Sequence, residues 1–476
     1  MTTALRRALE AVCPDRVIAR EHPRYDATRL LFNGMHDRRP RLIVLPSDRE
    51  ELRRVVPLAR ESGLPLAVRG AGHNIAGTAG VDDGVVLDLR LLDRVRIDPH
   101  RRTARVQGGA NWAQFDASAS RHGLAVTGGT FDTTGVGGLT LGGGIGHLMG
   151  RYGLSCDNVL TYSLVTADGD RLAVDAETEP ELDWALRGAG HDFGIVDEFV
   201  FRLHPVTTVY GGTVAYPAHE MTRAVELFRR LGSEGPDELV CILLLERYGR
   251  AQDPAAVLSV CYSGTDPTCP GLLDKQLRSL EVLDWQVEER PYLSMQQLLG
   301  RLPYGLRHYW SARCTDELPD ELIAALVERF QAGRRRGEFN DTVYLEAFGG
   351  AVRREAERPS AVGWRTARFN VTGMAIWEPA AADEEQIAWA RSVARAAEPW
   401  GVFGDGYVNY VSDAGTDRAG TARAVRTYGE RGYRRLAALK RRLDPDNVFR
   451  STYSIDPAAI DPAAIDPAAV DPSAGE

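Results

Sequence analysis

The spacing of apolar residues at the start of the chain predicts short strands joined by helices. Residues 41–46 (RLIVLP) and 64–70 (LPLAVRG) are apolar runs typical of strands. Between them, residues 48–62 carry apolar side chains at helical spacing, with acidic residues in the first turn, where they stabilise a helix. A short helix is also expected over residues 3–13. The chain therefore opens with a strand–helix–strand unit.

Further short strands follow at intervals marked by turn residues. They are expected at 84–89, 94–98, 103–109 and 124–129, with a helix near 112–122. Farther along, residues 163–177 predict a hairpin over Asp168–Gly169, followed by a helix at 181–188 and a strand at 194–206. This is an α+β unit with many short strands.

The pattern changes after Pro205. Between about 206 and 405, glycine becomes rarer, and alternating strands such as ELVCILLLE stand beside helical patterns such as PDELIAALVERFQAG. We therefore expect a separate domain there. After Ser454 the unit IDPAA repeats with a proline in every unit, which predicts a disordered or extended tail.

Composition and charge narrow the class of partner. The net charge of −9 and a pI near 5.7 leave no basic surface for nucleic acid or an anionic membrane, so a small substrate without net charge fits better. The six cysteines are scattered without the spacing of zinc or iron–sulfur ligands, so reduced thiols and no metal are expected. The N-terminus lacks an apolar signal segment, and no long apolar run follows, which predicts a cytoplasmic protein. Nothing in the sequence indicates the oligomeric state.

Two glycine clusters are the strongest candidates for a binding site. In 69-RGAGHNIAG-77, glycines after a predicted strand let the backbone approach a diphosphate, and a histidine in such a loop can touch the ligand. The spacing is not that of a Rossmann fingerprint, because no helix and no suitably placed acid follow. The second cluster, 135–153, predicts a long irregular loop. Taken singly, each cluster could also be a set of tight turns.

The order of seven motifs adds a family resemblance. RGAGHNIAG, GGTFDTTGVGGLTLGGGIG, YGLSCDNVL, VTADG, DWALRGAGHDFGIV, YVNYVSD and DPDNVFR, spread over about residues 38–455, resemble the berberine-bridge-enzyme-like FAD-linked oxidases. The resemblance implies an α+β fold with a PCMH-type FAD-binding domain of two α/β subdomains and an antiparallel-sheet substrate domain flanked by helices. The implied boundaries are 1–205 and 408–455 for the FAD domain, 206–407 for the substrate domain and 456–476 for the tail.

The resemblance also implies which residues hold FAD. His73 matches the histidine that bonds covalently to the flavin, and Phe131 stands where many plant members have a second bonding cysteine, so a single linkage is expected. Cys156 is expected to contact FAD through its backbone without a covalent bond, and His191 to be structural. The other implied cofactor-binding residues are Arg69, Gly70, Ala71, Gly72, Asn74, Thr130, Thr133, Thr134, Gly135, Gly137, Gly138, Gly143, Gly144, Gly146, Gly194, Val196, Tyr407 and Asn409.

The same resemblance suggests the chemistry. In related oxidases the second tyrosine of YxNY is the general base, which makes Tyr410 the first candidate and Tyr407 the fallback. If residues 407–413 form a strand, the two tyrosines point to opposite faces. A tyrosine with a pKa near 10 needs cations or donors nearby to act as a base at neutral pH, and we expect an arginine to supply them.

The implied reaction is proton removal by Tyr410, hydride transfer to flavin N5 and reoxidation by dioxygen to hydrogen peroxide, with Thr134 beside the path of oxygen. The substrate would be a small organic molecule, with a natural-product intermediate favoured. His308 and Tyr309, in the cluster 304-YGLRHYW-310, are candidates to line the substrate cleft. Three alternatives stay open: a flavin-dependent cyclase of a biosynthetic pathway, a carbohydrate oxidase and a non-catalytic flavin-binding protein.

Overall fold

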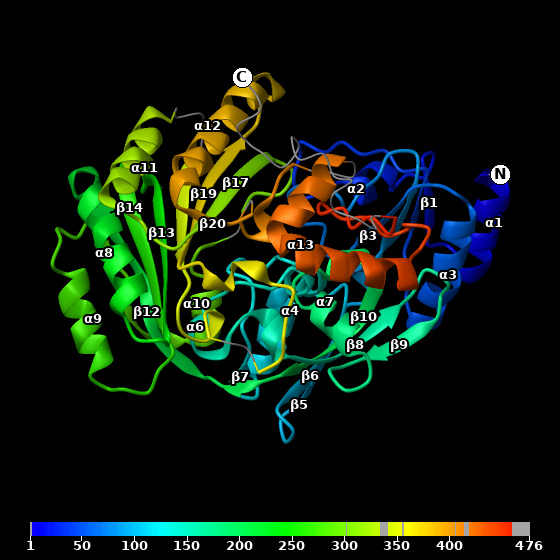
Figure 1. The fold of residues 1–476 in the computed structure, drawn as a ribbon, viewed down its shortest axis with the longest axis horizontal. Helices are drawn as coiled ribbons and strands as arrows, with labels where there is room; N and C mark the ends of the chain where they lie inside the picture. The colour runs from blue at the N-terminus through cyan, green and yellow to red at the C-terminus, as the bar shows by residue number, and fades with distance from the viewer. Residues whose placement is uncertain are drawn as a thin grey trace.

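The computed structural model describes residues 2–300, 302–333, 341–354, 357–404, 406–413 and 418–458. The predicted repeat tail falls outside the described residues from residue 459 on. Two lobes lie side by side, one built on two smaller sheets and the other on one large sheet (Figure 1). Segment α13, Arg418–Leu443, consists of two helical parts joined by a kink at Gly429, and it lies with the first lobe after the chain has passed through the second.

The first lobe opens with a four-stranded sheet in the order β1-β2-β4-β3. Strands β2, β4 and β3 are parallel, and β1 is antiparallel to β2. The strands are β1 Val17–Ala19, β2 Leu42–Val44, β3 Leu66–Arg69 and β4 Val85–Asp88. The helices of this region are α1 Thr2–Val12, α2 Tyr25–Arg29 and α3 Arg49–Glu61.

Helix α3 shows why the apolar spacing predicted a helix correctly in this segment. Asp48 caps it by accepting a hydrogen bond from the backbone N–H of Glu51 at 2.9 Å. Its apolar face, Leu52, Val55, Val56 and Ala59, is buried against the sheet, with the spacing expected of a helix packed on one side. The predicted strand–helix–strand opening is confirmed as β2, α3 and β3.

An antiparallel five-stranded sheet follows, in the order β5-β6-β10-β8-β9. Its strands are β5 Val95–Asp98, β6 Thr103–Gln107, β8 Val159–Val165, β9 Arg171–Val174 and β10 Ile195–Arg202, and β7 Leu124–Ala125 pairs with β11 His204–Pro205. The hairpin β8–β9 turns at Asp168–Gly169, as predicted. The helices here are α4 Trp112–Ser120, α5 Val136–Leu141, α6 Met149–Tyr152 and α7 Pro180–Leu186.

The second lobe is built on a nine-stranded antiparallel sheet whose strands all fall between residues 208 and 403. They are β12 Thr208–Pro217, β13 Leu239–Tyr248, β14 Asp253–Tyr262, β15 Asp284–Trp285, β16 Glu288–Pro291, β17 Arg307–Thr315, β18 Thr342–Ala347, β19 Phe369–Trp377 and β20 Gly401–Phe403. The helices are α8 Met221–Glu234, α9 Cys269–Leu277, α10 Tyr292–Gln296, α11 Asp320–Ala332 and α12 Asp383–Ala396.

The two faces of this sheet have different partners. Helices α8, α11 and α12 cover one face, where Leu243, Leu345 and Val371 join their apolar core (Figure 1). Alternate residues such as Tyr344 and Met374 point to the other face, where they pack with side chains of the first lobe. The strand period of two therefore places every second residue of β18 and β19 at the contact between the lobes.

Two expected local structures differ from the observed ones. Residues 408–410 form a 3-10 helix instead of part of a strand, so Tyr407 and Tyr410 do not point to opposite faces. The glycine cluster 135–153 is not an irregular loop throughout, because it contains α5 and α6. In both segments tertiary contacts override a local pattern that fitted an extended or irregular chain. Among the described residues, no helix has the length and apolarity needed to cross a membrane.

Candidate active site

A cavity lies where the two lobes meet. The empty space there is about 990 Å³, which includes a part open to solvent. The first lobe supplies the loop after β3, the segment around α5, and the 3-10 helix with Tyr410. The second lobe supplies Leu302 and Trp310. Predicted cofactor residues that line this cavity are Gly70, Ala71, Gly72, His73, Asn74, Thr130, Thr134, Gly135, Gly138, Tyr407 and Asn409.

A second cavity continues from the first. The two share seven lining residues: Val68, Gly70, Asn74, Thr78, Gly138, His191 and Asn409. The second also takes in the predicted residues Gly137, Gly194 and Val196, and it ends at the C-terminal segment 449–453. Together they make one elongated channel from Tyr410 to Tyr453.

The lining of this channel fits FAD. A Cβ atom added at Gly138 would meet no protein atom within 4 Å, so the backbone there is open to a ligand. Gly72 has a positive φ of +73°, which turns the loop before His73 in a way that glycine favours. Within the part of the chain that the structure describes, Arg450 is the only formally charged side chain that lines the second cavity, so a diphosphate would be held mainly by backbone N–H groups.

His73 presents a neutral imidazole to the first cavity. Burial, and after it the neighbouring His308, lowers its pKa to about 4. At neutral pH the ring therefore carries a nitrogen with a free lone pair, which is the form that can bond to an electrophilic carbon. His73 thus lies on the cavity wall in its neutral form.

Arg69 is placed differently from the expectation. Its buried guanidinium donates to the carbonyl oxygens of Thr28 and Arg29, at 2.6 and 3.1 Å, and lies 3.4 Å from a carboxylate oxygen of Asp88. These contacts tie α2 to the sheet instead of reaching into the cavity. Arg69 therefore supports the loop that carries His73, and its side chain is not in position to bind a diphosphate.

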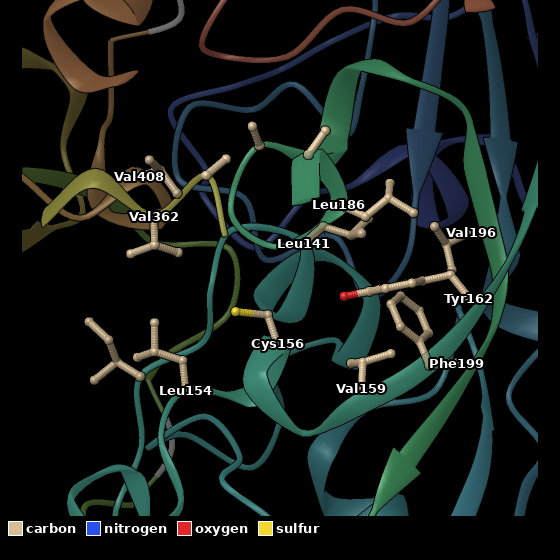
Figure 2. Close-up of a cluster of buried hydrophobic side chains, with 14 of the residues drawn as sticks. Leu141, Leu154, Cys156, Val159, Tyr162, Leu186, Val196, Phe199, Val362 and Val408 are labelled. Atoms are coloured by element: carbon tan, nitrogen blue, oxygen red, sulfur yellow. The ribbon is translucent and has the colours of Figure 1, made fainter. Parts of the chain in front are cut away.

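Some predicted cofactor residues lie behind the cavity wall. Those that line neither cavity, besides Arg69, are Thr133, Gly143, Gly144, Gly146 and Cys156. Gly146 packs so closely on Gly128 that a Cβ would lie 1.7 Å from its carbonyl oxygen. The thiol of Cys156 is fully buried beside apolar side chains such as Leu154 and Val159 (Figure 2). These residues pack behind the glycine-rich segment and support its backbone, and they do not face either cavity.

Tyr410 lines the first cavity, and its hydroxyl is hydrogen-bonded to Glu346, which lies buried behind it. The Tyr410 hydroxyl donates to Oε1 of Glu346 at 3.0 Å, and Asn370 donates to Oε2 at 2.9 Å. Glu346 is completely buried, and burial raises its pKa to about 7. Burial and the carboxylate beside it also raise the pKa of Tyr410 well above its ordinary value. The Glu346 carboxyl group, whose pKa lies near neutral pH, is thus hydrogen-bonded to the Tyr410 hydroxyl.

This pair corrects the expectation of an arginine beside Tyr410. The neighbours that act most strongly on the pKa of Tyr410 are Glu346, Tyr344 and Tyr407, and none of them is a cation. Sequence reasoning missed Glu346, although a signal was present. In 342-TVYLEA-347 the alternation places Tyr344 and Glu346 on one face, opposite apolar Val343 and Leu345. A glutamate on the inner face of a buried strand is unusual enough to mark a functional candidate.

Tyr407 has a different environment from Tyr410. Its hydroxyl accepts hydrogen bonds from the side-chain amide of Asn409 at 2.8 Å and from the backbone N–H of Gly144 at 3.2 Å. Its ring is buried against Trp364. Tyr407 therefore fixes the glycine segment to the 3-10 helix, and this position does not favour it as the base. His191, whose ring nitrogen contacts the carbonyl of Gly138 at 2.9 Å, is likewise placed to support the loop.

The cluster 304–310 contributes a residue other than the two expected. Trp310 lines the cavity, with its ring 5.1 Å from that of Tyr410 in an edge-to-face arrangement, and its buried indole N–H has no protein partner among the described residues. Tyr309 points to the opposite face of the sheet, where its hydroxyl donates to Asp413. His308 does not line the cavity, and it stacks instead on Phe32. Strand alternation explains why Tyr309 and Trp310 diverge.

Apolar side chains line one part of the first cavity. They are Phe32, Ile75 and Phe131 of the first lobe and Leu302 and Trp310 of the second, and behind them Ile242, Tyr344, Met374 and Ile376 belong to the same buried apolar cluster. Such a wall favours a flat, mainly apolar molecule, because polar groups placed against it would lose their hydrogen bonds to water.

Comparison with known proteins agrees with this site. A family model described as an FAD binding domain matches residues 40–175, and one described as berberine and berberine like matches residues 406–456. (R)-6-hydroxynicotine oxidase of Paenarthrobacter nicotinovorans is 31% identical over 458 residues, which cover 91% of this chain and 94% of that protein. An FAD-linked oxidoreductase of Dictyostelium discoideum is 30% identical over 424 residues, 88% of this chain and 89% of its own length.

A solved structure extends the comparison to the fold. The crystal structure of 6-hydroxy-D-nicotine oxidase from Arthrobacter nicotinovorans matches with a TM-score of 0.81 and 27% identity, covering 94% of this chain and 99% of that chain. The fold and the channel thus define an FAD-linked oxidoreductase of the PCMH type. Within that class, the chain belongs to the berberine-bridge-enzyme-like family. The predicted family and fold class are confirmed.

Proposed function

We propose that this FAD-dependent oxidoreductase is an oxidase that removes a proton and a hydride from a small, mainly apolar organic molecule. The observation that supports it is the meeting of His73, the open backbone at Gly138 and the Tyr410–Glu346 pair around one cavity. When bound, FAD supplies the electron acceptor, with the hydride going to N5 and the two electrons passing on to dioxygen to give hydrogen peroxide.

The residues of the chain handle the proton. Tyr410 takes the proton of a substrate O–H or acidic C–H while its own hydroxyl proton passes to Glu346, to which it is already hydrogen-bonded. This relay avoids a free phenolate, which the neighbouring carboxylate would destabilise. Glu346, with a pKa of about 7, has a base strength matched to neutral pH. Trp310 can donate its unpaired indole N–H to an acceptor on the substrate.

The wall of the cavity supports one substrate class over another. The apolar part of the lining, with Phe32, Phe131 and Trp310, suits a natural-product intermediate with an aromatic or alicyclic framework better than a carbohydrate, which needs many hydrogen-bonding partners. We propose that the protein acts on such a molecule in the cytoplasm, without a nucleic-acid or membrane partner. A cyclase remains the second candidate, because the same relay would also begin an oxidative ring closure.

Peroxide formation tests the reaction. Candidate natural-product alcohols, phenols and amines are mixed with the holoprotein without oxygen, and the flavin absorbance is followed before air is admitted. Bleaching by a substrate, with one peroxide formed per substrate after aeration, supports an oxidase. A ring-closed product would instead identify a cyclase, with one peroxide per substrate if the closure is oxidative and none if it is not. A flavin that no candidate reduces would favour the non-catalytic alternative.

Covalent attachment of the flavin through His73 gives the first prediction. Denatured wild-type protein is expected to keep flavin on the peptide that contains His73, whereas His73→Ala should release all of it, because its side chain offers no nucleophile. Mass spectrometry of the peptides measures both. Cys156→Ala is the matched control and should keep the linkage, since that thiol is buried away from both cavities. Flavin found on any other peptide would contradict the assignment.

The second prediction concerns pH. Because the carboxylate form of Glu346 accepts the proton, the rate of flavin reduction at low substrate concentration should rise with pH through about 7 and level off above it. Glu346→Gln should remove this limb and lower the plateau by about 10²-fold or more. Stopped-flow measurement of flavin reduction across the pH range checks both. A wild-type limb that persists in Glu346→Gln would assign it to another group.

A further inference from the structure

We propose that Phe32 and His308 are positioning residues, which hold the imidazole of His73 in the orientation from which it bonds to the flavin. This inference rests on the proposed covalent attachment at His73. The three rings form a continuous stack, with Phe32 in the middle. Its ring centroid lies 4.2 Å from that of His73 at an interplanar angle of 17°, and 4.3 Å from that of His308 at 29°.

Each ring comes from a different part of the chain. Phe32 lies between α2 and β2, His73 follows β3, and His308 lies in β17 of the second lobe. The stack therefore crosses the contact between the lobes, with Phe32 and His73 on the wall of the first cavity and His308 behind them. Tyr304 adds an edge-to-face contact with Phe32, at 6.0 Å and 74°, and its hydroxyl donates to the carbonyl of Leu30 at 3.1 Å.

The backbone around Phe32 is fixed from both sides. The side-chain amide of Asn33 donates to the carbonyl of Ile75 at 2.7 Å and to that of His308 at 2.8 Å, and its oxygen accepts from the N–H of His308 at 2.9 Å. Two backbone bonds, Gly34 to Leu306 and Gly305 to Phe32, close the same junction at 2.6 and 2.8 Å. Asn33 thus joins the loop that carries His73 to β17 by hydrogen bonds. These bonds restrict the backbone position of the neighbouring Phe32.

The stacked rings fix the plane of the His73 imidazole, which hydrogen bonds within its own loop do not. A histidine side chain has two rotatable bonds, and the His73 ring nitrogens make no hydrogen bond to any described residue. Without such a bond, ring contacts are what fix the plane of the imidazole. Burial also lowers the pKa of His308 to about 4, so both histidines are neutral at pH 7 and do not repel each other across Phe32.

Orientation matters because of the bond that is made. An imidazole nitrogen of His73 forms a bond to the 8α carbon of FAD as a C–H bond of that methyl group breaks. The methyl carbon and the imidazole each give up one proton to solvent, and the electron pair left by the C–H bond goes to the isoalloxazine ring. Dioxygen then takes the two electrons and two protons to become hydrogen peroxide. A misplacement of the nitrogen by about 1 Å can slow such a step by about 10²-fold.

The experiment follows the rate of attachment in the full-length chain. Protein made in riboflavin-limited cells is mixed with excess FAD, and the fraction of His73 peptide that carries flavin is followed by mass spectrometry. Reversible FAD binding is measured separately from the early change in flavin fluorescence. Phe32→Leu, which keeps bulk but removes the ring, should slow attachment by about tenfold or more while FAD affinity changes by less than about threefold.

Two further variants separate positioning from general stability. His308→Leu should slow attachment, whereas His308→Phe, which restores a ring, should return the rate to within about twofold of wild type. Phe115→Leu is the matched control, because it breaks a buried stack with Trp112, at 5.3 Å and 16°, that lines neither cavity. It should attach flavin at the wild-type rate.

The outcomes are distinct. Equal rates in Phe32→Leu and Phe115→Leu, whether both normal or both slow, would overturn the positioning role while the covalent attachment stands. Failure of His308→Phe to recover the rate lost in His308→Leu would remove His308 from the proposal. Wild-type protein without flavin on His73 would refute the proposed attachment itself, and the positioning role with it.

Discussion

Replacement of Tyr410 by phenylalanine should lower the rate constant of flavin reduction by about 10²–10⁴-fold, the range expected when a general base is lost. The change removes only the hydroxyl that donates to Glu346 at 3.0 Å, so the cavity shape and the bound flavin should be unchanged. Anaerobic stopped-flow measurement with a substrate found in the peroxide assay gives the rate constant. The flavin spectrum of the variant shows whether FAD is still held normally.

Tyr407→Phe is the matched comparison. The Tyr407 hydroxyl accepts from Asn409 and from the backbone of Gly144 and does not contact Glu346, so its loss should cost less than about tenfold. A normal rate in Tyr410→Phe together with a large loss in Tyr407→Phe would exchange the roles of the two tyrosines. Normal rates in both would remove tyrosine from the reaction.

Lys440→Met should lower the free energy of unfolding by about 3–5 kcal/mol, because it breaks a buried ion pair and leaves a carboxylate without its partner. Lys440 is fully buried in α13, and its ammonium donates to Asp444 and to the carbonyl of Asp192, both at 2.6 Å, and to the carbonyl of Phe449. These contacts hold the segment that ends the second cavity. Urea unfolding of the holoprotein measures the change, and FAD should also be retained more weakly before covalent attachment.

The chain supplies a natural control for this change. Its only other lysine, Lys275, is exposed on α9, so Lys275→Met should stay within about 0.5 kcal/mol of wild type. Equal losses in the two variants would point to an effect of removing any lysine. A normal unfolding midpoint in Lys440→Met would mean that the buried contacts of the ammonium contribute little net stability.

Some residues of the candidate site could be predicted from the sequence, and others could not, because their positions depend on contacts with distant segments. The motif around His73 could be recognised in the sequence because its glycines and histidine are close together along the chain. The structure places them on the first cavity. Arg69 belongs to the same motif, yet its guanidinium turns away, because the carbonyls that it satisfies lie in α2, about forty positions earlier. Strand 407–413 was a reasonable prediction from alternation, but the hydrogen bonds of Tyr407 and Tyr410 stabilise a 3-10 helix there.

The sequence by itself determined the local elements and the family. The Asp48 cap and the apolar spacing of α3 act within a few residues of each other, so they can be read without a partner. Tertiary structure alone decided which distant groups meet: Tyr410 with Glu346, 64 residues apart, and Phe32 between His73 and His308. Periodicity tells which face of a strand a residue takes, but the neighbour across that face is chosen by how the nine-stranded sheet packs on the first lobe.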